Sequence, residues 1–206
     1  MRSFAIAAGL FAVAALANPI NVARGSKEPC DEDAAPCMTY DQATEVAANF
    51  RQSIKNYSNA STIEHFTEDF VDYSASVSTL INGGCVDGPV DLNAPTFSGR
   101  EDFMAGQGAQ PTIPFKILNL YHTCDTVVIR WRSQGPGQEP EPVTGIIVIE
   151  AEYQKGDKQN PWLIKTVYSE FNSGAWLVNI GLFTPTCPPP PPPTKRSTLQ
   201  APVRMF

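Results

Sequence analysis

Apolar positions in the first third of the chain recur at helical spacing. From Tyr40 to Tyr57 they return every three or four residues, which predicts a helix with one buried face. Thr39 and Gln42, at the start of this stretch, have the spacing of a capping box. Two further boxes predict a short helical turn and a third helix that ends near Gly106 or Gly108. These boxes are Ser61 with Glu64 and Ser98 with Glu101.

Strand-like segments dominate the second half of the chain. Stretches rich in Ile, Val, Tyr and Trp are separated by Gly, Pro and Asp, a pattern that predicts an antiparallel meander. The predicted strands are 115–121, 126–132, 143–153 and 162–171, and an earlier strand is predicted over 70–76. Helices followed by consecutive strands indicate the α+β class, with a curved antiparallel sheet, a half-barrel or cone, wrapped on N-terminal helices.

The first seventeen residues have the pattern of a secretory signal peptide, with one Arg, an apolar run and a small-x-small sequence that ends at Ala17. A membrane anchor is the alternative, but the run from Phe4 to Ala17 is shorter than the ~20 residues that a spanning helix needs. We therefore expect cleavage after residue 17 and a secreted, extracellular protein that begins at Asn18. The expected remaining parts are an N-terminal extension (18–36), one folded domain (37–187) and a disordered proline-rich tail (188–206).

Acidic residues outnumber basic ones, 21 to 15, which gives a formal net charge of −6. Such a surface repels phosphate backbones and anionic lipid headgroups. We therefore expect neither nucleic acid nor a membrane as a partner.

The five cysteines fit an exported protein better than a metal site. None of them lies in a Cys-x-x-Cys pair, so the usual zinc spacing is missing, and we expect no metal and no cofactor. Disulfides are common in secreted domains. We expect a bond from Cys37 to Cys187, which would fasten both ends of the domain, and a bond from Cys85 to Cys124. Cys30 would be left over, and a bond from Cys30 to Cys37 is the alternative, because connectivity cannot be deduced from sequence.

Two N-glycosylation sequons, at Asn56 and Asn59, also suit an exported chain. They lie where the first predicted helix ends. Because neighbouring sites crowd one another, we expect one of them to be occupied more often than both.

Several short motifs resemble those of the nuclear transport factor 2-like superfamily, and in particular a group of fungal secreted domains. They are Tyr40–Ala43, Asp69–Ser74, Leu80–Cys85, Cys124–Val127, Trp131 and Thr166–Trp176. The resemblance covers residues 37–187 and implies a cone-shaped fold, like that of polyketide cyclases, with a pocket between sheet and helices. In this superfamily the pocket can hold a small apolar ligand, perform acid–base chemistry or be filled by side chains, so the fold does not determine the function.

Strand alternation predicts which side chains line that pocket. Lys116 and Lys165 lie in the middle of strands and should face water, which sends their neighbours inward. The predicted ligand-binding residues are Asn119, Tyr121, Trp131 and Thr166, with Val127 and Ile129 on the same face. The predicted catalytic residues are Glu170, Tyr168 and Tyr73.

Glu170 is the predicted centre of any chemistry. An apolar pocket disfavours the ionised form of a carboxyl group and tunes it towards general-base work, while Tyr73 or Tyr168 would donate to a developing oxyanion. Ketosteroid isomerase uses the same logic. The alternative is a structural role, in which Glu170 accepts hydrogen bonds from neighbouring backbone near a strand end.

Charged residues are predicted on the outward face of neighbouring strands. They are Arg130, Arg132, Glu150 and Glu152. Cross-strand ion pairs are the ordinary explanation. The superfamily resemblance implies an alternative, a homodimer formed through the outer face of the sheet.

Two classes of function follow from this pattern. The favoured one is a non-catalytic secreted module that binds a small apolar molecule or a partner protein at the pocket. The alternative is an isomerase, dehydratase or cyclase that acts by proton transfer on a polyketide-like substrate.

Overall fold

The computed structural model describes residues 35–186 of the chain. The predicted signal peptide, most of the N-terminal extension, the proline-rich tail, Cys30 and Cys187 lie outside the described residues. Among the helices of residues 35–186, none is long and apolar enough to cross a membrane.

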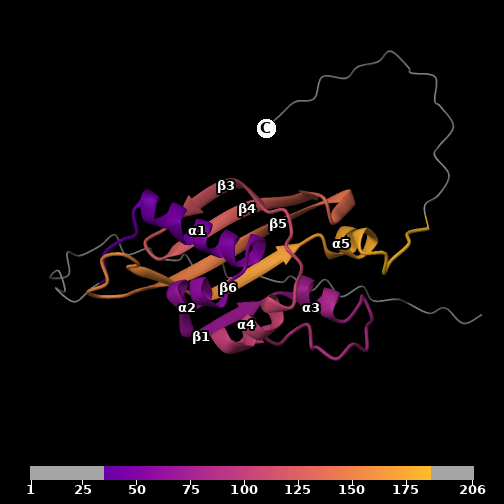
Figure 1. The fold of residues 1–206 in the computed structure, drawn as a ribbon, viewed down its shortest axis with the longest axis horizontal. Coiled ribbons are helices and arrows are strands. Elements are labelled where there is room, and N and C mark those ends of the chain that lie inside the picture. Colours follow the sequence, from indigo (N-terminus) through magenta and orange to yellow (C-terminus); the bar gives the residue numbers. More distant parts are fainter. Residues whose placement is uncertain (1–34, 187–206) are drawn as a thin grey trace, which may run out of the picture. The chain divides into compact units, whose positions relative to one another are not determined.

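The described part of the chain is a mixed α+β domain with a curved, unclosed sheet, which confirms the predicted fold class (Figure 1). Its helices are α1 (Tyr40–Lys55), α2 (Asn59–His65), α3 (Ala75–Ile81), α4 (Arg100–Gly108) and α5 (Ser173–Asn179). Its strands are β1 (Phe66–Tyr73), β2 (Phe97–Ser98), β3 (Lys116–His122), β4 (Thr126–Gly135), β5 (Gln138–Tyr153) and β6 (Trp162–Phe171). The strand order is β2-β1-β6-β5-β4-β3. The β1–β6 pair is parallel, whereas the other neighbours are antiparallel as predicted.

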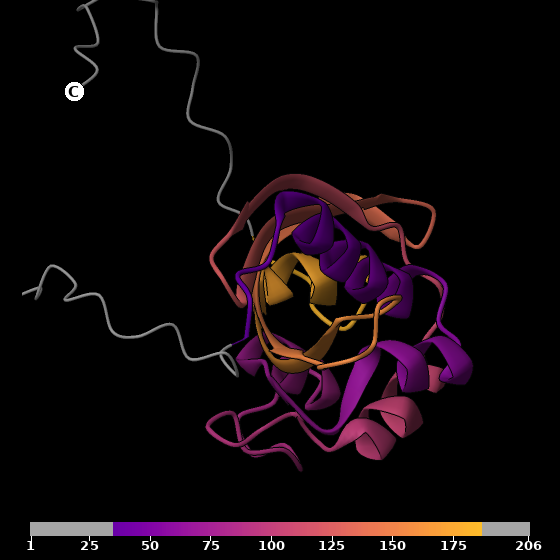
Figure 2. The same cartoon turned by 90° about the vertical axis from the view of Figure 1, so that its left-hand side faces the viewer.

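Helix α1 covers the concave face of the sheet, and its predicted capping box is confirmed. The Thr39 hydroxyl accepts a hydrogen bond from the backbone N–H of Gln42, and the Gln42 side chain accepts one from the backbone N–H of Thr39. The buried face of α1 carries Ala43, Val46, Ala47 and Phe50. Figure 2 looks along the sheet and shows its strands curving around this helix. Burial of a side chain such as Phe50 stabilises the domain by roughly 1.5–3 kcal/mol.

The two other predicted capping boxes are wrong. Ser58, rather than Ser61, caps α2, because the Ser58 hydroxyl accepts from the backbone N–H of Ser61. Helix α4 follows Gly99, whose φ of 109° favours glycine, and no side chain caps it. Its end at Gly108 agrees with the sequence prediction.

Two short helices were not predicted, and one of them shortens a predicted strand. Strand β1 ends at Tyr73, because the Ser74 side chain accepts from the backbone N–H of Val77 and starts α3. Helix α5 lies in the second half of the chain, where we expected only strands. Its cap is Asn172, whose side chain accepts from the backbone N–H of Ala175.

Side-chain alternation holds on β4 but breaks on β3 and β6. The three residues of β4 predicted to point inward are buried. Strand β3 has a register shift between Ile117 and Asn119, and the pairing of β6 with β5 shifts between Ile164 and Thr166. A bulge adds one residue, and because side chains alternate with a period of two, every later side chain changes face.

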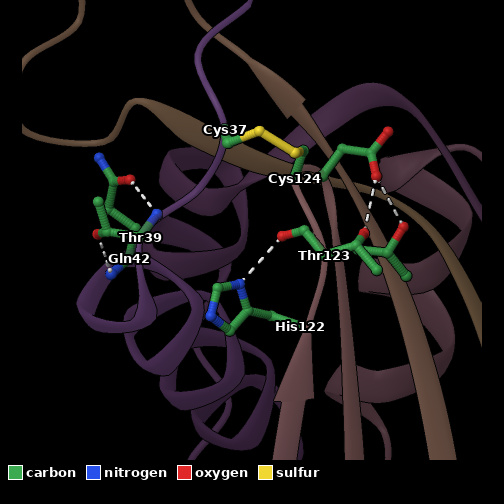
Figure 3. Close-up of a disulfide and its surroundings, with 8 residues drawn as sticks. Cys37, Thr39, Gln42, His122, Thr123 and Cys124 are labelled. Atoms are coloured by element: carbon green, nitrogen blue, oxygen red, sulfur yellow. Dashed lines mark hydrogen bonds between the residues drawn. A yellow bond between two sulfur atoms is a disulfide. The ribbon is translucent and has the colours of Figure 1, made fainter. Parts of the chain in front are cut away.

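One disulfide joins Cys37 to Cys124 (Figure 3). The predicted pairs Cys37–Cys187 and Cys85–Cys124 are therefore wrong, and Cys85 is an exposed free thiol in the structure. The cause is the turn between β3 and β4, which lies beside the segment that leads into α1. The backbone N–H of Met38 donates to the carbonyl of Cys124 at 2.8 Å, so the two cysteines meet at this contact.

The two predicted glycosylation sites lie at the connection between α1 and α2. Asn56 is the C-cap of α1, and Asn59 is the first residue of α2. Both side chains are exposed.

Candidate functional site

A cavity of about 510 Å³ lies between the concave face of the sheet and the helices. Phe50 of α1, Leu80 of α3 and Phe103 of α4 line it on the helical side, and Trp176 of α5 lines it at the end of the sheet. Trp131 of β4 forms part of its sheet wall. The curvature of the sheet explains this space, because helices packed on a curved sheet do not fill its concave side completely.

Aromatic side chains support one another around this cavity. Phe115 stacks on Trp131 with ring centroids 4.5 Å apart, and Phe97 meets Phe103 edge to face at 5.6 Å. Phe171 and Trp176 form a third pair at 5.1 Å. Such pairs fix the rings against the walls, so the aromatic side chains line the cavity and leave its centre open.

Asp72 of β1 is the carboxyl group among the described residues that line this cavity. Its side chain is 6% exposed, and its Oδ1 atom has no hydrogen-bond partner. Burial, with a smaller contribution from the nearby Glu170, raises the pKa of Asp72 from 3.8 to about 7. The group is therefore poised to gain or lose a proton near neutral pH.

Two neutral polar side chains, Gln138 and Ser169, also lie on the sheet wall of the cavity. The carbonyl oxygen of the Gln138 side chain accepts a hydrogen bond from the Asn179 amide at 3.2 Å, which orients Gln138. Within residues 35–186, no group of three or more His, Cys, Asp or Glu side chains could hold a metal ion. The polar chemistry of the cavity therefore consists of one acid and a few neutral hydrogen-bonding groups.

Of the site residues predicted from sequence, Trp131 lines the cavity. It is 3% exposed. The other predicted site residues are not among the lining residues: Glu170, Tyr168, Tyr73, Asn119, Tyr121 and Thr166. Tyr121 and Tyr168 are 64% and 42% exposed on the opposite face of the sheet, and Tyr168 stacks there on Tyr73.

Glu170 has the structural contacts that the sequence analysis named as the alternative. Its carboxylate accepts hydrogen bonds from the backbone N–H groups of Ala75 and Ser76, at 3.0 and 3.1 Å, and from the Ser76 hydroxyl. These are unpaired N–H groups in the first turn of α3. Glu170 therefore holds the start of α3 against the end of β6.

The two bulges explain why alternation misplaced these residues. On β6 the extra residue near Lys165 turns Val167 and Ser169 inward, so Tyr168 and Glu170 face outward. On β3 the bulge places Asn119 opposite the exposed Arg130. A bulge needs no particular residue type, so neither shift could be predicted from the residues of these strands.

Asp72 was missed because Tyr73 was assigned to the inner face. A signal for the correct assignment was present, since Phe70 and Asp72 lie two residues apart and must share a face. Phe70 is fully buried, as expected of a Phe beside a core. Period-two alternation from Phe70 would have placed the Asp72 carboxyl inside.

Among the described residues of the outer face, the predicted ion pairs between arginine and glutamate are not formed. Ile146 lies opposite Arg130, and Thr126 lies opposite Glu150. Instead, Lys165 in the bulge of β6 forms ion pairs with Glu152 and Asp69.

Comparison with known proteins gives a family and a set of similar folds. A family model described as an NTF2-like domain matches residues 36–183. A candidate ketosteroid isomerase from Kribbella flavida is 13% identical, with a TM-score of 0.45 and coverage of 79% of this chain and 92% of that chain. An NTF2-like protein of unknown function from Mesorhizobium loti is 18% identical, with a TM-score of 0.43 and coverage of 64% and 92%. Among curated proteins, none matches this chain.

Proposed function

We propose that this chain, which belongs to the NTF2-like domain family, binds a small, mostly apolar molecule in the cavity between its sheet and its helices. The observation that carries the proposal is the cavity of about 510 Å³ with aromatic walls and few polar groups. Small-molecule sites in proteins typically enclose about 300–1,000 Å³ and have this composition. Asp72, Gln138 and Ser169 would orient the bound molecule.

Titration with a neutral apolar fluorophore tests this proposal. We expect saturable binding of one molecule per chain, with a change in tryptophan fluorescence, because Trp131 and Trp176 line the cavity. Leu80→Trp adds bulk at the cavity wall and should weaken binding by about tenfold or more. Leu92→Trp is the matched control, since Leu92 is an exposed residue that is not among the lining residues. Equal binding by both variants would contradict the cavity as the site.

Proton transfer is the second candidate function, and a specific observation favours it. A general base works best when its pKa lies near the working pH, and burial raises the pKa of Asp72 to about 7. Ionised Asp72 would remove a proton from a carbon next to a carbonyl group and return it at a different position. Return of the proton to another carbon would be isomerase chemistry, and its return to a leaving hydroxyl group, which departs as water, would be dehydratase chemistry. Attack of the carbanion on a second carbonyl of the same molecule, with the proton returned to that oxygen, would be cyclase chemistry. In each case Asp72 takes the role that was predicted for Glu170.

Deuterium exchange tests the catalytic candidate directly. Cyclic ketones that fit the cavity should exchange their α-protons in heavy water faster with the wild type than with Asp72→Asn, by about 100-fold or more. Asp69→Asn, on the same strand but exposed, is the matched control. Exchange at the uncatalysed rate with the wild type would leave binding alone as the function.

We also propose that the protein is secreted and carries a glycan at Asn56 or Asn59. The signal-peptide pattern, the Cys37–Cys124 disulfide and the exposure of both asparagines support this proposal. Expression in a glycosylating secretory host should yield a protein that begins at Asn18 and shifts in mass when the glycan is removed. Retention of Met1 on exported protein would contradict cleavage, and an unchanged mass would contradict glycosylation.

A homodimer through the outer face of the sheet is a further part of the proposal. One cross-strand row on that face consists of Tyr73, Tyr168, Val148, Val128 and Tyr121. The next row places Glu170 and Arg130 on either side of Ile146. A twofold axis along β5 would bring Glu170 over the partner's Arg130, so this face is complementary to itself.

Sedimentation measurements test this pairing. We expect a dimer at about 100 µM chain, and Tyr168→Lys should convert it to a monomer. Tyr40→Lys is the control, because Tyr40 is also an exposed tyrosine but lies on α1. A monomeric wild type at that concentration would contradict the dimer.

A further inference from the structure

We infer that the molecule bound in this cavity is a cation, a protonated amine on an apolar skeleton with one or two rings, whose ammonium group pairs with Asp72. The inference rests on the proposed binding function and adds the chemical class of the ligand. It follows from the charges that surround the cavity, from the state of the Asp72 carboxyl and from the aromatic walls.

The charge of the cavity wall is entirely acidic among the described residues. The lining residues include Asp72 and no Lys, Arg or His. Glu170, on the neighbouring strand β6, is close enough to act on Asp72 electrostatically. Two acidic side chains without a basic one repel an anionic ligand and attract a cation, and the low dielectric of a buried site strengthens both effects.

The elements packed around Asp72 supply no counter-ion within the described part of the chain. Strand β2 places Phe97 opposite Asp72, and β6 places Val167 opposite it, with Glu170 as the charged group near it. Helices α1, α3 and α4 contribute apolar, glycine or amide residues to the cavity wall, and none of these is titratable. A positive partner for Asp72 must therefore come from the ligand.

The Asp72 carboxyl is also unsatisfied as a hydrogen-bond acceptor. Its Oδ1 atom is buried without a partner. An unpaired carboxylate inside a protein is costly, whereas one paired with an N–H donor in good geometry is stabilised. An ammonium group carries up to three donors and a positive charge, and it supplies both of the missing interactions.

The aromatic walls complete a site for a cation. Rings of Phe103, Phe115, Trp131 and Phe171 face a common space, together with those of three further aromatic residues of the lining. The faces of aromatic rings attract cations within about 6 Å, and desolvation strengthens this attraction. The same rings cover the apolar skeleton of the ligand. An apolar amine thus uses both the carboxyl group and the aromatic rings of the wall.

A neutral ligand makes the opposite prediction for pH. It would accept a hydrogen bond from the protonated Asp72 and would bind better in acid, when that proton is present. A protonated amine needs the ionised carboxylate and should bind better as the pH rises through about 7, the pKa of Asp72. The direction of the pH dependence therefore separates the two classes of ligand.

Calorimetry with a matched pair of probes tests this inference on the full chain. The probes are 2-(1-naphthyl)ethylamine, which is protonated throughout the pH range used, and 2-(1-naphthyl)ethanol, which has nearly the same size and shape but no charge. At about pH 8.5 the amine should bind about tenfold or more tightly than the alcohol, and at about pH 5.5 its affinity should fall by about tenfold or more. The affinity of the alcohol should fall little or not at all in acid.

Two aspartate variants locate the charge that the amine uses. Asp72→Asn should reduce the affinity of the amine to that of the alcohol and leave the alcohol nearly unchanged. Asp69→Asn, which removes an exposed acid from the same strand, should leave both affinities unchanged. If Asp72→Asn does not fold, the pH dependence of the wild type still decides the question.

The outcomes separate this inference from the proposed function. Equal or tighter binding of the alcohol at about pH 8.5, or an amine affinity that does not depend on Asp72 or on pH, overturns the cationic ligand and leaves the apolar cavity as a binding site. Failure of both probes, when the neutral fluorophore binds, also overturns the inference alone. Failure of both probes and of the fluorophore overturns the proposed function and the inference together.

Discussion

Asp72 on the inner face of the sheet and Glu170 on its outer face are neighbouring carboxyl groups with opposite surroundings. Asp72 is 6% exposed and has an unpartnered oxygen, whereas Glu170 is exposed and accepts hydrogen bonds from the first turn of α3. Burial raises the pKa of Asp72 to about 7. Hydrogen-bond partners and burial, rather than the presence of a carboxyl group on a strand, therefore decide which acid is available to bind a ligand or to take up a proton.

The two faces of the sheet should differ most in what an aromatic residue contributes to stability. Trp131→Ala removes a buried ring that stacks on Phe115 and lines the cavity, and we expect a loss of about 3–5 kcal/mol in the free energy of unfolding. Tyr168→Ala removes a half-exposed ring from the outer face and should cost less than about 1 kcal/mol in a monomer. Urea denaturation at low protein concentration measures both. Equal losses would show that the inner and outer faces are assigned wrongly.

Asp72→Asn should stabilise the ligand-free protein at alkaline pH. The pKa of Asp72 is about 7 in the folded chain, compared with 3.8 for an ordinary, solvated aspartate such as that of the unfolded chain. The folded state therefore holds this proton more tightly than the unfolded state. The free energy of unfolding therefore falls as the pH rises from about 4 to about 7, by up to about 4 kcal/mol from this group, and stays lower above that range.

Denaturation of the wild type and Asp72→Asn at two pH values measures this effect. At about pH 8 the variant should gain up to about 4 kcal/mol in the free energy of unfolding, because it no longer buries a carboxylate. About 1–3 kcal/mol of this gain is offset by the cost of a buried amide without hydrogen-bond partners. At about pH 4 the advantage should disappear, because the wild-type carboxyl is then protonated. A variant that is less stable than the wild type at about pH 8 would indicate that the Asp72 carboxylate has a favourable partner.

Glu170→Gln should have the opposite sign and a smaller size. It removes the negative charge that faces the N–H groups of Ala75 and Ser76 and should destabilise the protein by about 1 kcal/mol. Binding of a neutral ligand in the cavity should not change, because Glu170 is not among the lining residues. Glu150→Gln is the control, because Glu150 is exposed on β5 and lies opposite Thr126 and Thr166. A loss of affinity for a neutral ligand with Glu170→Gln, without one in the control, would show that Glu170 belongs to the site.

Hydrophobic periodicity predicted most of the fold. The helix that begins at Tyr40, with its capping box, and the four strands of the meander were found because their patterns are local and regular. Helices α3 and α5 are seven residues long, and each depends on a single capping side chain, Ser74 or Asn172, that is also common in turns. Short elements of this kind leave little periodicity to detect.

The site was less predictable, because its composition depends on register. Trp131 was placed correctly since no bulge lies between it and the other buried residues of β4. The bulge on β6 places Tyr168 and Glu170 on the outer face. On β1 the sequence prediction assigned Tyr73 to the inner face, whereas the structure buries Asp72 there. The Cys37–Cys124 bond was missed for a related reason. It depends on the contact between the α1 entrance and the β3–β4 turn, which no local pattern encodes.

Nuclear magnetic resonance titration of the side-chain carboxyl carbons, with the wild type and Asp72→Asn, tests the central claim most directly. We predict that one aspartate carboxyl of the ligand-free wild type titrates with a midpoint near 7 and that this resonance is missing from Asp72→Asn. Addition of the naphthyl amine should lower the midpoint, because a cation favours the ionised carboxylate. If every aspartate resonance of the wild type instead titrates below about pH 5, Asp72 is not an unpaired acid inside an apolar cavity, and the assignment of the site is contradicted.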